Sequence, residues 1–172
     1  MLLSYNTRQM LDLWRLRRGY EPLRSDGIVV RRDGLDTDAL WLAEIDVWYA
    51  DLLANAPLEM VEVTDIASEV SLTLEGDCGY CILPDRCYRV VEVMGRGWER
   101  PVVPVAPDAV DPLDLNEFVG CGADNPLAIV DGRRLIVRHP GGTHPARLLA
   151  VMRPDDDTYR FHDQALSLIN RE

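Results

Sequence analysis

A chain of 172 residues is long enough to form one ordinary domain with a hydrophobic core. Its 47% hydrophobic and 27% charged residues exclude a wholly disordered chain, a collagen-like repeat and a disulfide-knot protein. The formal net charge is −11, which argues against a nucleic-acid binder because contacts with phosphates need a basic face.

All 18 basic residues are arginine, and lysine is absent. Codon bias in a GC-rich genome is the simplest explanation. The functional alternative is that arginine is favoured at interfaces, because a guanidinium forms bidentate ion pairs with carboxylates and an ammonium does this less well. We expect such interface arginines at Arg15, Arg17, Arg18, Arg31 and Arg32.

The N-terminal part of the sequence predicts two helices. The first covers residues 6–18, with a polar residue to cap its start and Gly19 after its basic last turn. The second covers residues 36–56, because apolar residues recur at helical spacing and Pro57 ends the pattern. Between them, residues 20–35 contain two Asp-Gly pairs, and we expect a projecting loop or hairpin arm.

The second predicted helix has an unusually wide apolar stripe, which indicates contacts on more than one side. Trp41, Trp48 and Tyr49 belong to this stripe. Aromatic residues at helical spacing are most often core residues. An interface and a ligand-binding shelf are the alternatives, and we count Trp41 and Trp48 among the candidate interface residues.

After Leu58 the apolar pattern changes to the alternation that is typical of strands, although residues 59–67 also fit a helix. A hairpin is expected where two strands meet at Asp131-Gly132, and a last helix at residues 159–169. The expected strands are residues 61–63, 70–74, 81–84, 88–94, 127–130, 135–138 and 147–152. Residues 101–105 are expected to form an edge-like strand or an extended arm.

The sequence therefore predicts an α+β protein, with N-terminal helices followed by a mainly antiparallel β-sheet or sandwich and a short C-terminal helix. The helical region is residues 1–57. The β-rich region is residues 58–172 and includes a long loop at 106–126, which is rich in Pro, Asp and Gly. The first residues lack the features of a signal peptide, and no apolar run is long enough to span a membrane. We expect a protein that is made in the cytoplasm and has no membrane partner.

Four cysteines, Cys78, Cys81, Cys87 and Cys121, are more consistent with thiols or metal ligands than with disulfides in such a protein. Cys78 and Cys81 form a CxxC, but a zinc ribbon has two such pairs. A redox CxxC lies at a helix N-terminus, and this one lies in a glycine-containing turn. Ordinary thiols are the favoured interpretation, and a structural metal is the main alternative.

The remaining polar motifs do not form a catalytic set. His139 and His144 lie five residues apart on one Pro- and Gly-rich loop, where a solvated loop is favoured over an acid–base or metal site. The sequence contains no P-loop, dinucleotide-binding, G-x-S-x-G or HExxH motif. We therefore expect no enzymatic activity and no cofactor.

The order of features in residues 36–170 resembles small bacteriophage head–tail connector proteins, of the adaptor and tail-tubular type found in short-tailed phages. The matching motifs are Trp48-Tyr49 with Leu52-Leu53 before Pro57, Leu83-Pro84 before Arg89-Val90-Val91-Glu92-Val93, Asn125-Pro126 before the Asp131-Gly132 hairpin, and a strand ending at Pro154 before a last helix. The cysteines are not part of this pattern.

This resemblance implies a structural virion protein that is made in the host cytoplasm and forms a ring between portal and tail. Its partners would be copies of itself, the portal and the tail proteins, and DNA would pass through the ring without sequence-specific binding. Two alternatives remain open. One is a small metal-binding module built on the cysteines, and the other is a ligand-binding α+β domain with a pocket lined by Trp41, Trp48 and Trp98.

Overall fold

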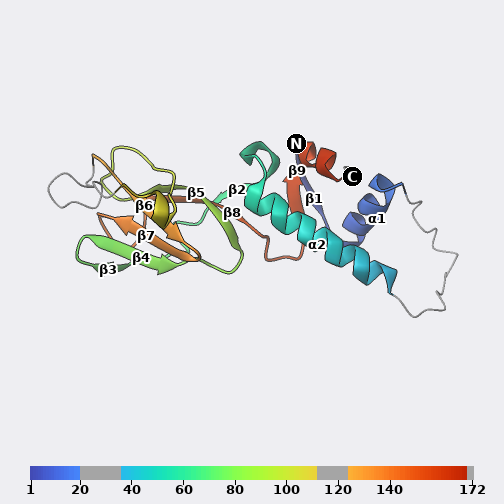
Figure 1. The fold of residues 1–172 in the computed structure, drawn as a ribbon, viewed down its shortest axis with the longest axis horizontal. Helices are drawn as coiled ribbons and strands as arrows, with labels where there is room; N and C mark the ends of the chain where they lie inside the picture. The colour runs from blue at the N-terminus through green and yellow to red at the C-terminus, as the bar shows by residue number, and fades with distance from the viewer. Residues whose placement is uncertain (20–35, 112–123, 170–172) are drawn as a thin grey trace. The chain divides into compact units, whose positions relative to one another are not determined.

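The structure is a computed structural model that describes residues 1–19, 36–111 and 124–169 (Figure 1). The chain divides into two compact units, one formed by Met1–Glu62 with Arg153–Glu172 and the other by Val63–Met152. The expected arm at residues 20–35 and most of the loop at 106–126 lie outside the described residues. The expected α+β class is confirmed, since the described part contains two α-helices followed by the strands of two antiparallel sheets, with a further strand at each end of the chain.

Both predicted helices form in the first unit. Helix α1 (Thr7–Arg17) begins at Asn6, whose side chain accepts a hydrogen bond from the Gln9 N–H, while the Gln9 side chain accepts one from the Asn6 N–H. Gly19 follows the helix with φ of +79°, a conformation that glycine adopts without strain. Helix α2 (Thr37–Asn55) is capped by the Asp36 carboxylate and ends just before Pro57.

The predicted C-terminal helix is wrong. Its first residues form strand β9 (Tyr159–His162), and a short 3-10 helix, η4 (Asp163–Leu168), follows. Strand β9 pairs antiparallel with β1 (Leu2–Tyr5), a strand that the sequence patterns did not predict. In β9 the aromatic residues at 159 and 161 are buried and alternate with half-buried polar residues, which is the pattern of a strand with one face on a core.

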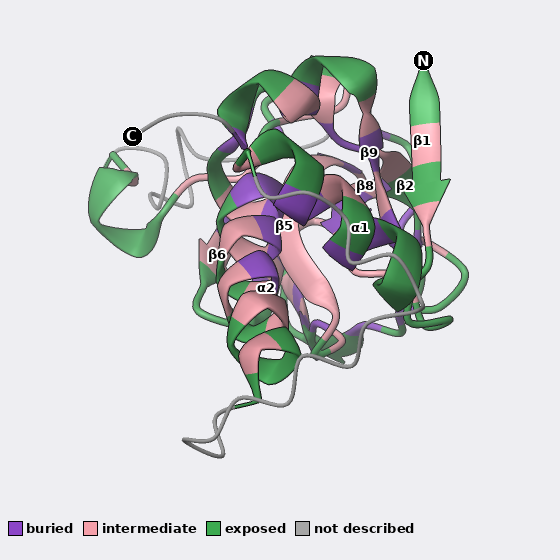
Figure 2. Ribbon diagram, turned by 90° about the vertical axis from the view of Figure 1, so that its right-hand side faces the viewer, coloured by how far each residue is buried: buried purple, intermediate pink, exposed green. Residues whose placement is uncertain are grey.

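The core of the first unit is an aromatic cluster between its helices and β9. The Trp48 ring lies 5.4 Å from both Trp14 and Phe161, and Tyr49 packs edge-on against Tyr159 at 5.1 Å. Helix α2 buries only part of its circumference against this cluster, as Figure 2 shows. A one-turn 3-10 helix, η1 (Leu58–Met60), follows α2, so the helix alternative for residues 59–67 does not hold.

The second unit consists of two antiparallel sheets. The three-stranded sheet has the order β2-β8-β5, and the four-stranded sheet has the order β3-β4-β7-β6. Their strands are β2 (Val63–Asp65), β3 (Thr73–Glu75), β4 (Cys78–Ile82), β5 (Cys87–Met94), β6 (Ala128–Asp131), β7 (Arg134–Arg138) and β8 (Arg147–Met152). A short 3-10 helix, η2 (Pro107–Ala109), precedes the second gap in the description.

One side of each sheet faces a common core, in which Val93, Leu135, Val137, Leu148 and Ala150 are fully buried. The expected hairpin between β6 and β7 is confirmed, with Gly132 at φ of +57° in its turn. The expected edge strand at 101–105 is reduced to isolated bridges at its two ends, to β5 and β6. Among the described residues, no helix has the length and apolar composition needed to cross a bilayer.

Candidate functional site

The predicted interface arginines of α1 have different environments. Arg15 is buried and forms an ion pair with Asp38, and Arg18 pairs with Glu44 and lies over the Trp14 ring at 5.3 Å. These two arginines therefore join α1 to the acidic side of α2. Arg17 is exposed and forms no ion pair with any described residue. Arg31 and Arg32 lie outside the described residues.

The two candidate interface tryptophans are half-buried. Trp48 is in the aromatic cluster of the first unit, which supports the core interpretation for this residue. Trp98 is buried in the second unit, where its indole N–H donates a hydrogen bond to the His139 carbonyl oxygen at 2.8 Å. The pocket of three tryptophans would thus need residues from both units.

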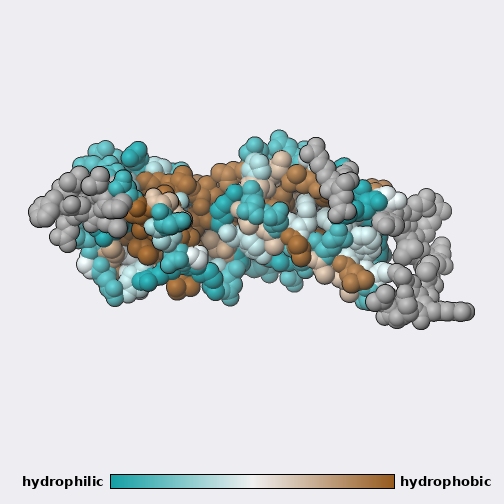
Figure 3. Space-filling model, in the orientation of Figure 1, coloured by the Kyte–Doolittle hydropathy of each residue, from teal (hydrophilic) through white to brown (hydrophobic). Residues whose placement is uncertain are grey.

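Helix α2 carries a second apolar surface on the side away from the aromatic cluster. We call it the outward stripe; it consists of Leu40, Ala43, Val47, Ala50 and Ala54, which follow heptad spacing along one side of the helix. Leu40 and Val47 are 59% and 73% exposed. In Figure 3, hydrophobic residues are visible on the surface near the N-terminal end of this helix. The wide stripe expected from the sequence is therefore present, and part of it contacts nothing in the described structure.

Every charged residue of α2 is acidic. Glu44 and Asp51 lie along one edge of the outward stripe, and Asp46 lies along the other. Asp46 accepts hydrogen bonds from Arg153 at 2.6 Å and from the Tyr159 hydroxyl at 3.2 Å. Within the described residues, Asp51 accepts only from the neutral Asn55 amide, at 2.7 Å. The stripe is thus an apolar surface edged by carboxylates, of which Glu44 and Asp46 are paired with arginines and Asp51 is not paired with a basic residue in the described part of the chain.

The described cysteines are not arranged as a metal site. Cys78 and Cys81 lie three residues apart on the regular strand β4, so their side chains project from opposite faces of the sheet. The Cys78 thiol accepts a hydrogen bond from Arg138 at 3.3 Å. Burial raises the pKa of Cys81 to about 11 and also raises that of Cys87, which disfavours the thiolate that metals need. Cys121 lies outside the described residues. The described residues contain no group of three or more His, Cys, Asp or Glu side chains that could hold a metal ion.

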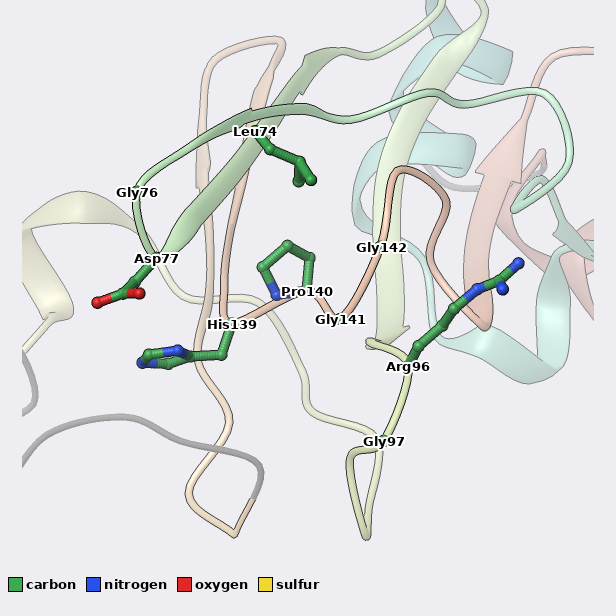
Figure 4. Close-up of a pocket in the computed structure, with 9 residues that line it drawn as sticks. All are labelled: Leu74, Gly76, Asp77, Arg96, Gly97, His139, Pro140, Gly141 and Gly142. Atoms are coloured by element: carbon green, nitrogen blue, oxygen red, sulfur yellow. The ribbon is translucent and has the colours of Figure 1, made fainter.

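An open pocket of about 510 Å³ in the second unit contains one of the predicted histidines (Figure 4). It is lined by Leu74, Gly76, Asp77, Arg96, Gly97, His139, Pro140, Gly141 and Gly142. His139 has φ of +48°, which is unusual for a residue with a side chain. Its N–H donates to the Asp77 carbonyl at 2.6 Å, and its carbonyl accepts from the Trp98 indole. These two hydrogen bonds hold His139 in its unusual backbone conformation, which is therefore explained by the packing of the loop.

The side chains at this pocket do not form a catalytic set. In Figure 4 the Asp77 carboxylate and the His139 ring point to the same side, while the Arg96 side chain extends away from them. No hydrogen bond or ion pair between described residues joins the side chains of Asp77 and His139. His144 lies elsewhere on the loop, with its Nδ1 at 2.8 Å from the Val70 carbonyl. The structure thus does not place the two predicted histidines next to a shared group of acidic side chains.

Comparison with models of known protein families gives no match. A search of curated proteins also gives no significant match.

Proposed function

We propose that this protein is a structural subunit of a bacteriophage head–tail connector, which forms a ring between portal and tail and continues the DNA channel. In this proposal it is a virion protein with no catalytic activity. Its partners are copies of itself, the portal and the tail proteins. The resemblance of the motifs in residues 36–170 to such connectors supports the proposal, as does the order of helices before antiparallel sheets.

The observation that carries the proposal is the outward stripe of α2. The opposite side of this helix already packs on the aromatic cluster, so the fold of the first unit does not account for the exposed Leu40 and Val47. Exposed apolar residues that continue along a whole helix are typical of a surface that another protein covers. A ring subunit needs such a surface, whereas a monomeric enzyme or ligand-binding domain does not.

The charge distribution supports the same function. Seven described arginines pair with carboxylates of their own chain, namely Arg15, Arg18, Arg86, Arg133, Arg147, Arg153 and Arg160. Because carboxylates outnumber arginines by 29 to 18, the surplus charge on the surface is negative. A negative channel wall does not bind phosphates, so DNA can pass through it without being held.

Two observations test the proposal. The gene should lie beside genes for a portal, a major capsid protein and a terminase. Electron microscopy of the purified protein, alone and with that portal, should show rings with a central channel. A gene surrounded by metabolic genes, or a protein that forms no ring with or without the portal, would contradict it.

A further inference from the structure

The outward stripe of α2 has a complementary surface in the second unit of the same chain. Strands β4 and β7 are adjacent, and Ile82 stands opposite Arg134 while Tyr80 stands opposite Ile136. These four residues alternate with the core residues of their strands, so they project from the face of the sheet away from the core. We call them the β4–β7 face.

The β4–β7 face combines an apolar patch with one arginine, Arg134, which stands opposite Asp131 of β6. The solvent-facing side of an antiparallel sheet is usually polar, yet here it carries Ile82, which is 65% exposed, beside Tyr80 and Ile136. The Arg134 guanidinium lies 4.7 Å from the centre of the Tyr80 ring and forms no ion pair with a described residue. The carboxylate of Glu75 on the neighbouring strand accepts a hydrogen bond from the Tyr80 hydroxyl at 2.7 Å. The face thus offers an exposed cation next to an apolar patch.

We propose that the outward stripe of one copy packs on the β4–β7 face of a second copy. The stripe is apolar with carboxylates along its edges, and the face is apolar with Arg134 at its edge. Leu40 to Ala54 extends about 21 Å along the helix, long enough to cross both strands, which lie about 4.8 Å apart. In this arrangement Asp51, which has only a neutral partner among the described residues of its own chain, meets Arg134 of the next copy.

Charge also disfavours the simplest alternative, which is pairing of the outward stripe with itself. Glu44 and Asp46 are already paired with Arg18 and Arg153, but two copies of α2 packed through this stripe would offer no basic partner to Asp51 of either copy, because α2 contains no basic residue. The contact is therefore heterologous: each copy uses one surface from each of its units. A heterologous contact forms a ring when its rotation closes, so this inference rests on the proposed ring and identifies its subunit contact.

Two single substitutions test the contact. Val47→Glu damages only the outward stripe, and Ile82→Glu damages only the β4–β7 face. We expect each variant alone to lose self-association by at least about tenfold in dissociation constant, because a charge is placed in an apolar contact. An equimolar mixture should form a 1:1 dimer and nothing larger, since the mixture retains one intact surface of each kind. Val103→Glu, at a residue that is 72% exposed, is the matched control and should associate like the wild type.

Sedimentation velocity and native mass spectrometry over a range of concentrations measure these outcomes, and circular dichroism verifies that each variant is folded. As a second test, Asp51→Arg and Arg134→Glu should each weaken association by about three- to tenfold, and the double variant should recover it. A mixture that stays monomeric while the wild type associates would overturn the contact but leave the proposed ring intact. Normal association of Ile82→Glu, or a wild type that is monomeric at every concentration, would also overturn the contact. The gene neighbourhood and imaging with the portal decide the proposed function separately.

Discussion

Replacing Tyr49 with phenylalanine should destabilise the first unit by about 2–3 kcal/mol. The Tyr49 hydroxyl is both donor and acceptor for one backbone residue: it donates to the Arg160 carbonyl at 3.1 Å and accepts from the Arg160 N–H at 3.0 Å. Because Tyr49 is fully buried, the substitution leaves both backbone groups without this partner. An unsatisfied buried polar group costs about 1–3 kcal/mol, while the aromatic ring and its packing are retained.

The matched control is Tyr159→Phe, which removes a second hydroxyl from the same cluster. Among the described residues the Tyr159 hydroxyl donates only to Asp46, at 3.2 Å, and Asp46 keeps its ion pair with Arg153. We therefore expect a loss of about 0.5–1 kcal/mol. Urea unfolding followed by tryptophan fluorescence measures both variants, because Trp48 packs against Tyr49. Equal losses in the two variants, or an unchanged midpoint for Tyr49→Phe, would refute the role assigned to this hydroxyl.

The pH dependence gives an independent measurement on the same residue. Burial raises the pKa of Tyr49 to about 12, from an ordinary value of 10.0. Between these two pH values the unfolded chain has lost the phenolic proton while the folded chain still holds it, so rising pH favours unfolding. The stabilisation is complete below pH 10 and falls by about 3 kcal/mol towards pH 12. Because Tyr49→Phe has no proton to lose, the stability difference between wild type and variant should shrink over this range. A constant difference would contradict the raised pKa.

Three further predictions concern local features of the fold. Gly141→Ala should cost at least about 2 kcal/mol in thermal unfolding, because φ is +71° and a Cβ would collide with a backbone carbonyl. Gly132→Ala, where φ is +57° and the space is open, should cost only about 1 kcal/mol; equal losses would rule out the collision. Asn6→Ala should lower stability by about 1 kcal/mol through loss of the helix cap, and an unchanged melting temperature would count against the capping box. Cys81 should react with a maleimide at least about tenfold more slowly than Cys78, measured by peptide mass spectrometry, because it is buried and its pKa is raised; similar rates would contradict this.

The arginine-only composition has a structural counterpart in the described residues. Arg15 and Arg18 were expected at an interface between subunits, but both pair with carboxylates of α2 in the same chain. These arginines join two helices that the chain connects only through a long segment. Arg134 is instead the arginine that we propose at the contact between subunits, because it lies over an aromatic ring and is exposed.

The sequence by itself determined the features that depend on a few neighbouring residues. Asn6 and Asp36 begin the two helices and Pro57 follows the second, because caps and proline act within one helical turn. Asp131-Gly132 determined the β6–β7 hairpin in the same way, since a two-residue turn needs a residue that tolerates positive φ. These local signals were enough to predict the α+β class.

Only the tertiary structure decided the features that depend on distant partners. Residues 159–162 carry no local signal strong enough to separate strand from helix, and they become a strand because β1 pairs with them from the other end of the chain. The CxxC motif shows how far apart the two cysteines are in the sequence, but not the backbone conformation between them. Because the motif lies in a strand, the two thiols project from opposite faces of the sheet. The same holds for α2: the pattern predicted apolar residues on more than one side, but only packing decided which side the aromatic cluster covers and which remains exposed. Burial is a property of the assembled unit, and for this reason the candidate contact surface was not predictable residue by residue from the sequence.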